Sequence, residues 1–263
     1  MKYGLRELMN YTDDQLLDTC LNVTGHFEGG TPKYSAVTGN FDGMGLSAGI
    51  IQWNLGQGTL QQLLKTIAAH MGATKADSFF TGPVITTLMN LQPAAAIQYA
   101  KAHLLDAGGV KLQPAAVVAW EKFLNDPQSV KDQRAYAQTT VLAHAKKLAA
   151  QFLPTEAGRS RVVAFFFDTV VQQGSMKNVV PATMFPTTEA MALAAQHSSK
   201  CHEQWESVLQ NDTLAGRLMF YALERAKEGN PTYLWDTFSR RATIGCRVGV
   251  VHETNIDLTH LLD

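Results

Sequence analysis

A helical pattern dominates the sequence after Gly82 and leaves little room for a large sheet. Prolines 93 and 114 stand where a first helical turn tolerates the missing N–H. The helices predicted in this part cover residues 93–105, 114–124, 130–152, 159–173, 188–197, 201–209, 213–227 and 231–241. Gly245 and Gly249 then predict a loop or a short strand near the end of the chain.

The N-terminal part mixes two helices with a different kind of segment. Thr12 and the two acids after it predict a capped helix that ends at Gly25, and Thr59 predicts the cap of a second helix that runs to about His70. Residues 34–53 are rich in Gly, Ser, Asn and Asp, and they close on the apolar run 48–53. That composition predicts a small hairpin or irregular sheet whose last strand is buried. We therefore expect a mainly α fold with one small β element, as a single domain spanning residues 1–263.

The overall composition is that of a globular protein. Hydrophobic residues make up 46% of the chain and charged residues 17%, with a net charge of −1. A partner held mainly by its phosphates would favour a strong positive excess, so we expect no nucleic acid, although a local basic patch could still grip a polyanion. We expect no cofactor.

The cysteines predict neither a metal site nor a complete set of bridges. Their number is odd, so they form either three free thiols or one bridge and one free thiol; the three are Cys20, Cys201 and Cys246. His197 and His202 flank Cys201, but no second cluster with metal-ligand spacing accompanies them.

No targeting or membrane segment is expected. The first residues, Met1 to Glu7, lack the apolar core and the small-residue cleavage site of a signal peptide. The longest apolar run, Val162 to Val171, is interrupted by Asp168 and is too short to span a bilayer. A substrate outside the cytoplasm would therefore require export by another route.

Two carboxylates carry the candidate chemistry. Glu28 follows the first helix, and Asp42 lies among the glycines of residues 39–45. A hairpin between them could fold Asp42 back to face Glu28 across a cleft, which is the arrangement that glycosidic cleavage needs. Phe27 is an apolar neighbour that suits a proton donor at position 28. Each acid also has a plain interpretation, as a solvated loop residue and as part of an Asp-Gly turn.

The segment after Asp42 resembles known catalytic hairpins. Residues 42–51, DGMGLSAGII, are similar to the D-G-x-G-x-T-A-G-I-I hairpin of the family 46 chitosanases, which follows a helix that ends in a catalytic Glu. Residues 45–52 also resemble the G-x-S-x-G-L-M-Q pattern of goose-type lysozymes and lytic transglycosylases. Residues 27–30 and 52–60 look most like the lysozyme-like domains of phage lysins and secreted antibacterial effectors. The resemblance is specific over residues 25–64 and implies a lysozyme-like α+β domain with two helical lobes around a cleft.

The resemblance also implies roles for particular residues. Glu28 would be the general acid, Asp42 the base that activates water, and Ser47 would replace the chitosanase Thr that helps to hold that water. Met44 stands where those chitosanases often have Arg, and Gln52 where they have Gly; both departures favour peptidoglycan over chitosan.

Further residues are expected to bind the glycan: Gln52, Trp53, Asn54, Gln57, Asp168 and Gln172. Residues 166–174, which include the last two, resemble a helix that lines the cleft, and residues 240–244 and 249–252 could also return to it.

Several of these residues have an alternative structural interpretation. Trp53 could equally form the buried end of a strand, and Asn54 and Gln57 could cap the next helix. Asp168, on an apolar helix, is expected to form an ion pair with Arg240 or Arg241. His26 is expected to be local scaffolding.

The resulting hypothesis is a monomeric muramidase. It would cleave the β-1,4 bond between N-acetylmuramic acid and N-acetylglucosamine with inversion, in the periplasm or cell wall, after delivery by a secretion machine or phage lysis. Its partners would be the peptidoglycan glycan strand and a dedicated immunity protein. The alternatives are a chitosanase or chitinase, a lytic transglycosylase, and a wall-binding module without activity.

Overall fold

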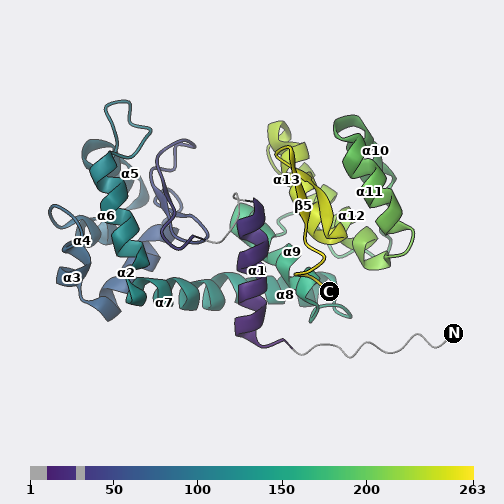
Figure 1. Cartoon of the computed structure of the whole chain (residues 1–263), viewed down its shortest axis with the longest axis horizontal. Helices are drawn as coiled ribbons and strands as arrows, with labels where there is room; N and C mark the ends of the chain where they lie inside the picture. Colours follow the sequence, from purple (N-terminus) through teal and green to yellow (C-terminus); the bar gives the residue numbers. More distant parts are fainter. Residues whose placement is uncertain (1–10, 28–32) are drawn as a thin grey trace. The chain divides into compact units, whose positions relative to one another are not determined.

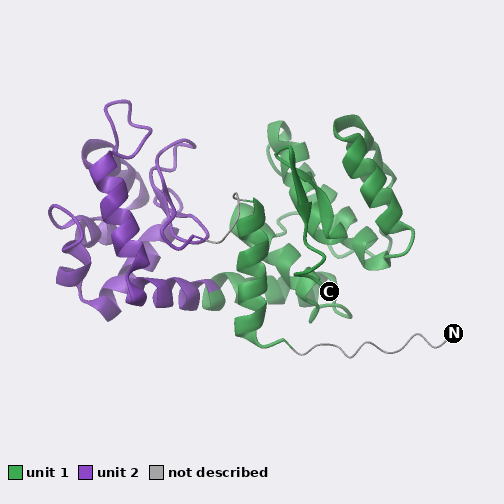
Figure 2. Cartoon of the chain, viewed as in Figure 1, with its two compact units in different colours: residues 1–31, 138–263 green, residues 32–137 purple. Residues whose placement is uncertain are grey.

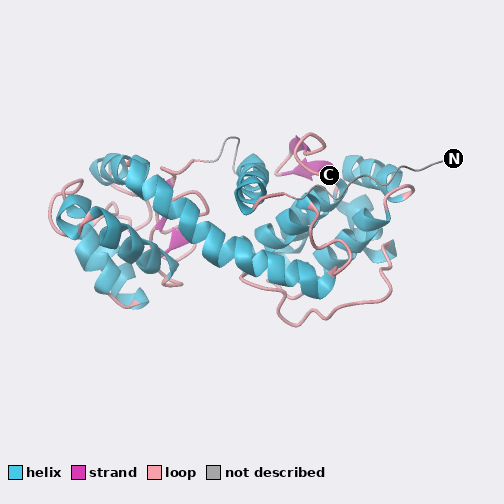
Figure 3. Cartoon of the chain, turned by 90° about the horizontal axis from the view of Figure 1, so that it is seen from below, coloured by secondary structure: helices cyan, strands magenta, loops and turns pink. Residues whose placement is uncertain are grey.

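A computed structural model describes residues 11–27 and 33–263 (Figure 1). The described chain is mainly helical with short strands, as Figure 3 shows. These strands pair antiparallel. The mainly α fold is thus confirmed, with two small sheets among the described residues in place of the one β element expected. No helix in the described ranges is long and apolar enough to cross a membrane.

The chain divides into two compact units (Figure 2). Unit 1 contains residues 1–31 and 138–263, and unit 2 contains residues 32–137. The helical conformation is continuous along the chain across the division at residue 138: α7 (Pro127–Tyr136) leads through the π-helical turn η1 (Ala137–Leu142) into α8 (Ala143–Phe152). The single catalytic domain expected from the sequence stays a prediction.

Unit 2 begins with a small sheet. Strands β1 (Val37–Thr38), β2 (Ser47–Ala48) and β3 (Trp53–Asn54) pair antiparallel in that order. The small hairpin or irregular sheet expected from residues 34–53 is confirmed. The apolar run 48–53 is not one continuous strand, because Gly49 and Gln52 adopt positive φ angles of 84° and 55° and turn the chain between β2 and β3. The buried end of that segment is confirmed by Trp53, which is 5% exposed.

Helices make up the rest of unit 2: α2 (Thr59–Met71), α3 (Ala73–Asp77), α4 (Val84–Asn90), α5 (Pro93–His103), α6 (Pro114–Asn125) and α7 (Pro127–Tyr136). Helix α2 buries a continuous apolar stripe against α4 and α7. The sequence did not predict α3 and α4, and it placed the start of α7 three residues late, because Asp126 accepts a hydrogen bond from Gln128 N and caps the helix. Thr59 is the first residue of α2, and Gly58 precedes it as the N-cap residue.

Unit 1 is built from long helices: α1 (Asp13–Phe27), α8 (Ala143–Phe152), α9 (Ser160–Gln173), α10 (Thr188–His197), α11 (Ser199–Leu209), α12 (Thr213–Lys227) and α13 (Leu234–Cys246), with a 3₁₀ turn η2 (Pro231–Tyr233). Helix α9 packs against α1, α8 and α13, and its residues 160–169 are all buried. The core of this unit is therefore organised around α9.

Two helix ends differ from the expectation, both at glycines. Helix α1 passes Gly25 and ends at Phe27, since the buried Val23 and Phe27 extend its apolar face. Helix α13 passes Gly245 and ends at Cys246. A Cβ on Gly245 would lie 3.0 Å from the Cβ of Leu218, so this glycine lets α12 and α13 approach closely inside a helix.

The short strand expected near the end of the chain is a hairpin. Strands β4 (Val248–Val251) and β5 (Thr254–Asp257) pair antiparallel, with β5 labelled in Figure 1. His252 and Glu253 form the two-residue loop at φ angles of 49° and 63°, as the twist of a tight hairpin requires. The hairpin follows α13 directly and packs on it.

The three cysteines lie in unit 1 as buried free thiols. Burial raises the pKa of the Cys20 thiol, and the nearby Asp168 raises that pKa further. Burial also raises the pKa of the Cys246 thiol. Of the two alternatives from the sequence, three free thiols is the one observed.

Candidate active site

The loop that carries Asp42 lies in unit 2 between β1 and β2. Gly43 and Gly45 adopt φ angles of 81° and 85°, and this lets the chain fold tightly around the carboxylate. Asp42 Oδ1 accepts a hydrogen bond from Met44 N at 3.0 Å. The side chain is exposed, so a carboxylate of fixed orientation faces the solvent.

Asn40 fixes the base of this loop. Its Oδ1 accepts from Gly45 N at 2.7 Å, its Nδ2 donates to Gly109 O at 3.2 Å, and its backbone N donates to Val110 O at 2.7 Å. A Cβ on Gly39 would lie 2.0 Å from Val110 O, so only glycine permits this approach of the two backbones. The sequence showed Asn40 near Asp42, but two of its partners, Gly109 and Val110, are about seventy residues further along the chain and no local pattern indicates them.

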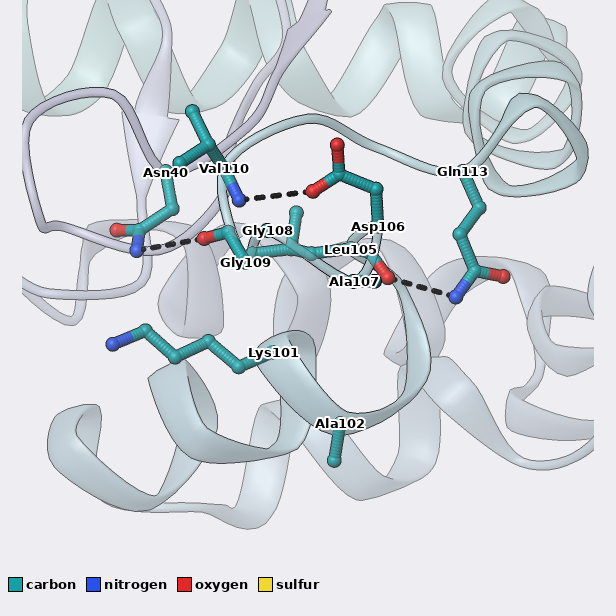
Figure 4. Close-up of a pocket in the computed structure, with 10 residues that line it drawn as sticks. All are labelled: Asn40, Lys101, Ala102, Leu105, Asp106, Ala107, Gly108, Gly109, Val110 and Gln113. Atoms are coloured by element: carbon teal, nitrogen blue, oxygen red, sulfur yellow. Dashed lines mark hydrogen bonds between the residues drawn. The ribbon is translucent and has the colours of Figure 1, made fainter.

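A cavity of about 600 Å³ opens beside Asn40 (Figure 4). Its wall includes the turn 105–113, which Asp106 holds by accepting from Val110 N and Lys111 N, and which Gln113 holds by donating to Leu105 O. Lys101 extends toward Asn40 from the last turn of α5, as Figure 4 shows. The Asp42 loop thus packs on the hydrogen-bonded turn 105–113, and the open cavity lies next to it.

The predicted glycan-binding residues of the hairpin make local hydrogen bonds. Gln52 donates from Nε2 to Ala36 O and Gly49 O, and its Oε1 accepts from Thr38 Oγ1. Asn54 Oδ1 accepts from Gln57 N at 2.8 Å, which fixes the turn before α2 rather than the helix itself. Ser47 stands opposite Asn54 in the β2–β3 pair and is half-buried. A glycan-binding role for these residues stays a prediction.

Trp53 is in the position of a core residue. Its ring packs against Tyr136, with the centroids 5.9 Å apart and tilted by 58°. Burial raises the pKa of the Tyr136 phenol. Of the two interpretations from the sequence, the buried strand end is the one that the structure shows, and a direct contact of Trp53 with sugar stays a prediction.

The other predicted acid region lies in unit 1. Asp168 is fully buried on α9, and its Oδ1 accepts from Arg240 Nε at 2.8 Å. Arg241, also fully buried, faces Asp168 Oδ2 with its Nε at 3.8 Å, which is an ion pair but too long for a hydrogen bond. The predicted ion pair is confirmed. Burial lowers the pKa of Arg241 to about 10 even though Asp168 raises it, and the guanidinium groups of Arg225 and Arg240 lower it further.

The ion pair is connected to the end of α1. The guanidinium carbon of Arg240 lies 4.6 Å from the centre of the Phe27 ring, a cation–π contact. Phe27 is 7% exposed and is the residue directly before Glu28. Glu28 itself lies outside the described residues, as do the two glycines after it. Arg240 of the buried ion pair therefore holds Phe27, the residue directly before Glu28.

Gln172 and His26 lie at the edges of this region. With its amide oxygen facing Arg240, Gln172 accepts from Arg240 Nε and Nη1 at 3.1 and 3.2 Å. Its side chain is exposed, so it covers the ion pair from the surface. His26 Nδ1 lies 2.9 Å from Asn22 O, a contact within α1 that agrees with local scaffolding.

Two buried residues of the site region were not predicted. Arg225 donates from Nε to Ser175 O and from Nη2 to Gln173 O, and so binds carbonyls at and just after the end of α9. Gln133 accepts from Ile50 N and donates to Leu124 O, which ties the β2–β3 turn to α6. For Arg225 the available signal was a charged residue on an otherwise apolar helix face, as for Asp168. Gln133 gave no such signal, because it shares the buried face of α7 with Ser129 and Asp132.

Comparison with known proteins gives no relatives. No family model, no curated protein and no solved structure matches the chain. Within the described ranges, no group of three or more His, Cys, Asp or Glu side chains could hold a metal ion.

Proposed function

We propose that this chain is a lysozyme-like glycoside hydrolase that cleaves the β-1,4 bond between N-acetylmuramic acid and N-acetylglucosamine in peptidoglycan. Glu28 is the general acid in this proposal and Asp42 the general base. The two residues belong to the segment that resembles lysozyme-like catalytic hairpins, residues 25–64.

The observation that carries the proposal is the buried ion pair next to Phe27. A buried pair loses much of its Coulomb energy to desolvation, so it is a weak source of stability. Here Asp168 fixes Arg240, and Arg240 covers the ring of the residue that precedes Glu28. Such an arrangement supports a role in positioning the chain at Glu28, because a proton donor must keep its place relative to the bond it cleaves.

The Asp42 loop supports the second role. A general base needs access to water and a fixed direction, and Asp42 is exposed and accepts a hydrogen bond from Met44 N. Asn40 and the positive-φ glycines keep the loop in this shape. An oriented carboxylate on the surface is what activation of a water molecule requires.

The proposed reaction is a single displacement at the anomeric carbon. The Glu28 carboxylic acid gives its proton to the leaving glycosidic oxygen as the C1–O bond breaks. Water attacks C1 from the opposite face and loses its proton to Asp42, while the Ser47 hydroxyl helps to orient that water. Inversion requires carboxyl groups roughly 6.5–9.5 Å apart, which leaves room for the water.

Product analysis tests this proposal. Purified peptidoglycan is digested with the parent chain and with Glu28→Gln and Asp42→Asn, and the fragments are analysed by mass spectrometry. We expect reducing ends with one added water, and a rate loss of about 10²–10⁴-fold in each variant. Matched controls are Glu121→Gln and Asp14→Asn, two exposed acids outside the candidate site.

Other outcomes would assign another function. Anhydro-muramic ends would indicate a lytic transglycosylase, and faster release from chitosan or chitin would indicate a chitosanase or chitinase. Glycan binding without turnover, unaffected by Glu28→Gln, would indicate a wall-binding module.

The cellular setting forms part of the same proposal. A wall hydrolase that reaches the periplasm by a secretion machine or phage lysis should be toxic when directed to the periplasm and harmless in the cytoplasm. A dedicated immunity protein should suppress that toxicity by binding the candidate site. Equal toxicity in both compartments would contradict this setting.

A further inference from the structure

A second cavity in unit 2 has an unusual lining. It has a volume of about 310 Å³ and lies where the start of α2, the end of α4 and the start of α5 meet. Five carboxamide side chains line it: Gln57, Gln61, Gln62, Asn90 and Gln92. Thr59, Lys65 and Tyr136 complete its polar wall, and none of its described lining residues is acidic. The volume falls at the lower end of the range for ligand pockets, which suits a sugar-sized group.

We propose that this cavity is a binding site for an N-acetylated amino sugar of the glycan strand. Carboxamides both donate and accept hydrogen bonds, so they match acetamido and hydroxyl groups. Lys65 would attract the carboxylate of a muramic acid residue and repel the ammonium group of glucosamine. The inference rests on the proposed function and narrows its substrate to N-acetylated polymers.

Gln61 provides an independent indication of a ligand. Its side chain is 4% exposed, and its Nε2 donates to Leu55 O at 3.1 Å. Its Oε1 is buried and has no hydrogen-bond partner among the described residues. Buried carbonyl oxygens are rarely left unpaired in folded proteins, and an N–H or O–H group from a bound sugar would pair this one.

The cavity is linked to the catalytic hairpin within the same unit. Asn54 in β3 holds the turn at Gln57 through its Oδ1, and Asn54 pairs across the sheet with Ser47. Tyr136 is half-buried and rests on Trp53, so the buried tryptophan supports one wall of the cavity. A sugar bound in this cavity would thus have a fixed position relative to strands β2 and β3, which follow Asp42.

Binding to an inactive full-length chain tests the inference. Glu28→Gln is titrated in a calorimeter with the tetramer of N-acetylglucosamine and with the tetramer of glucosamine. We expect the acetylated tetramer to bind about tenfold or more tightly, because only the glucosamine tetramer carries ammonium groups near Lys65.

Surface variants locate the site without disturbing the core. A substitution of the buried Gln61 could unfold the chain, so the double variant Gln57→Ala/Gln92→Ala, in which both side chains are exposed, is used instead. We expect it to weaken binding of the acetylated tetramer by about tenfold, the effect of one or two lost hydrogen bonds. Gln98→Ala, at an exposed position of α5 outside this cavity, is the matched control and should bind as the parent does.

Three results would overturn the inference. They are equal or tighter binding of the glucosamine tetramer, an undiminished affinity in the double variant, and no binding of either tetramer. Hydrolysis of peptidoglycan by the parent chain is measured separately, so each of these results can occur while the proposed function stands.

Discussion

Asp168 in unit 1 and Asp42 in unit 2 are both held by hydrogen bonds, but their surroundings are opposite. Asp168 is fully buried and is balanced by the guanidinium groups of Arg240 and Arg241. Asp42 is exposed and is oriented by a backbone N–H within a glycine-rich loop. Asp168 therefore has a structural role in the core of unit 1, whereas Asp42 is accessible to a substrate. Substitutions should separate these two roles cleanly.

The largest expected effect on stability is at Asp168. Asp168→Asn removes the charge that balances two buried guanidinium groups, and breaking a buried pair typically costs about 3–5 kcal/mol. The free energy of unfolding, measured by urea titration, should fall by that amount. The same substitution at Asp42 should change it by less than about 0.5 kcal/mol, since the side chain is exposed. Equal losses at both positions would contradict the comparison.

A glycine beside the exposed loop should show an intermediate effect. Gly39→Ala places a Cβ against Val110 O and forces the Asn40 loop away from the turn that braces it. Overpacking of this kind costs about 1–3 kcal/mol. Activity should fall along with stability, because the loop that orients Asp42 is displaced.

The control for this loop is an unrestricted glycine in unit 1. Gly158 has open space at its Cβ position, so Gly158→Ala should be neutral by the same urea titration. If Gly39→Ala were as stable and active as Gly158→Ala, the proposed bracing of the Asp42 loop would be wrong.

The smallest effect concerns pH. Burial raises the pKa of Asp212, but the hydrogen bond and charge of the buried Arg161 outweigh it and leave that pKa below its usual value. A lowered folded-state pKa adds stability above the unfolded pKa of about 3.9 that is lost as the pH falls through the folded value. Asp212→Asn should therefore flatten the acid side of the stability curve measured by thermal unfolding. An unchanged acid slope would contradict the ion pair.

The sequence predicted regular features better than long-range ones. Helix α9 and its Asp168 pair could be foreseen, because a charged residue on an apolar face needs a partner wherever the chain supplies one. The ends of α1 and α13 were predicted too early. Gly25 and Gly245 have the sequence signature of a helix C-terminus, but both lie buried inside their helices. The turn at Gly49 was missed because the apolar run 48–53 has the composition of one strand.

The candidate site divides in the same way. Asp42 and its glycines could be identified from a local pattern and a resemblance. Other features depend on residues far apart in the chain that only the fold brings together. They are the hydrogen bond of Asn40 to Gly109, the hydrogen bond of Gln133 to Ile50 and the carboxamide cavity. Spacing in the sequence carries no signal for such contacts.

The most direct measurement of the central claim is the rate of peptidoglycan cleavage by Glu28→Gln and Asp42→Asn at unchanged stability. The account predicts hydrolytic products from the parent chain and losses of about 10²–10⁴-fold in both variants. It also predicts that both variants unfold at the same urea concentration as the parent. Cleavage at the parent rate by either folded variant would contradict it.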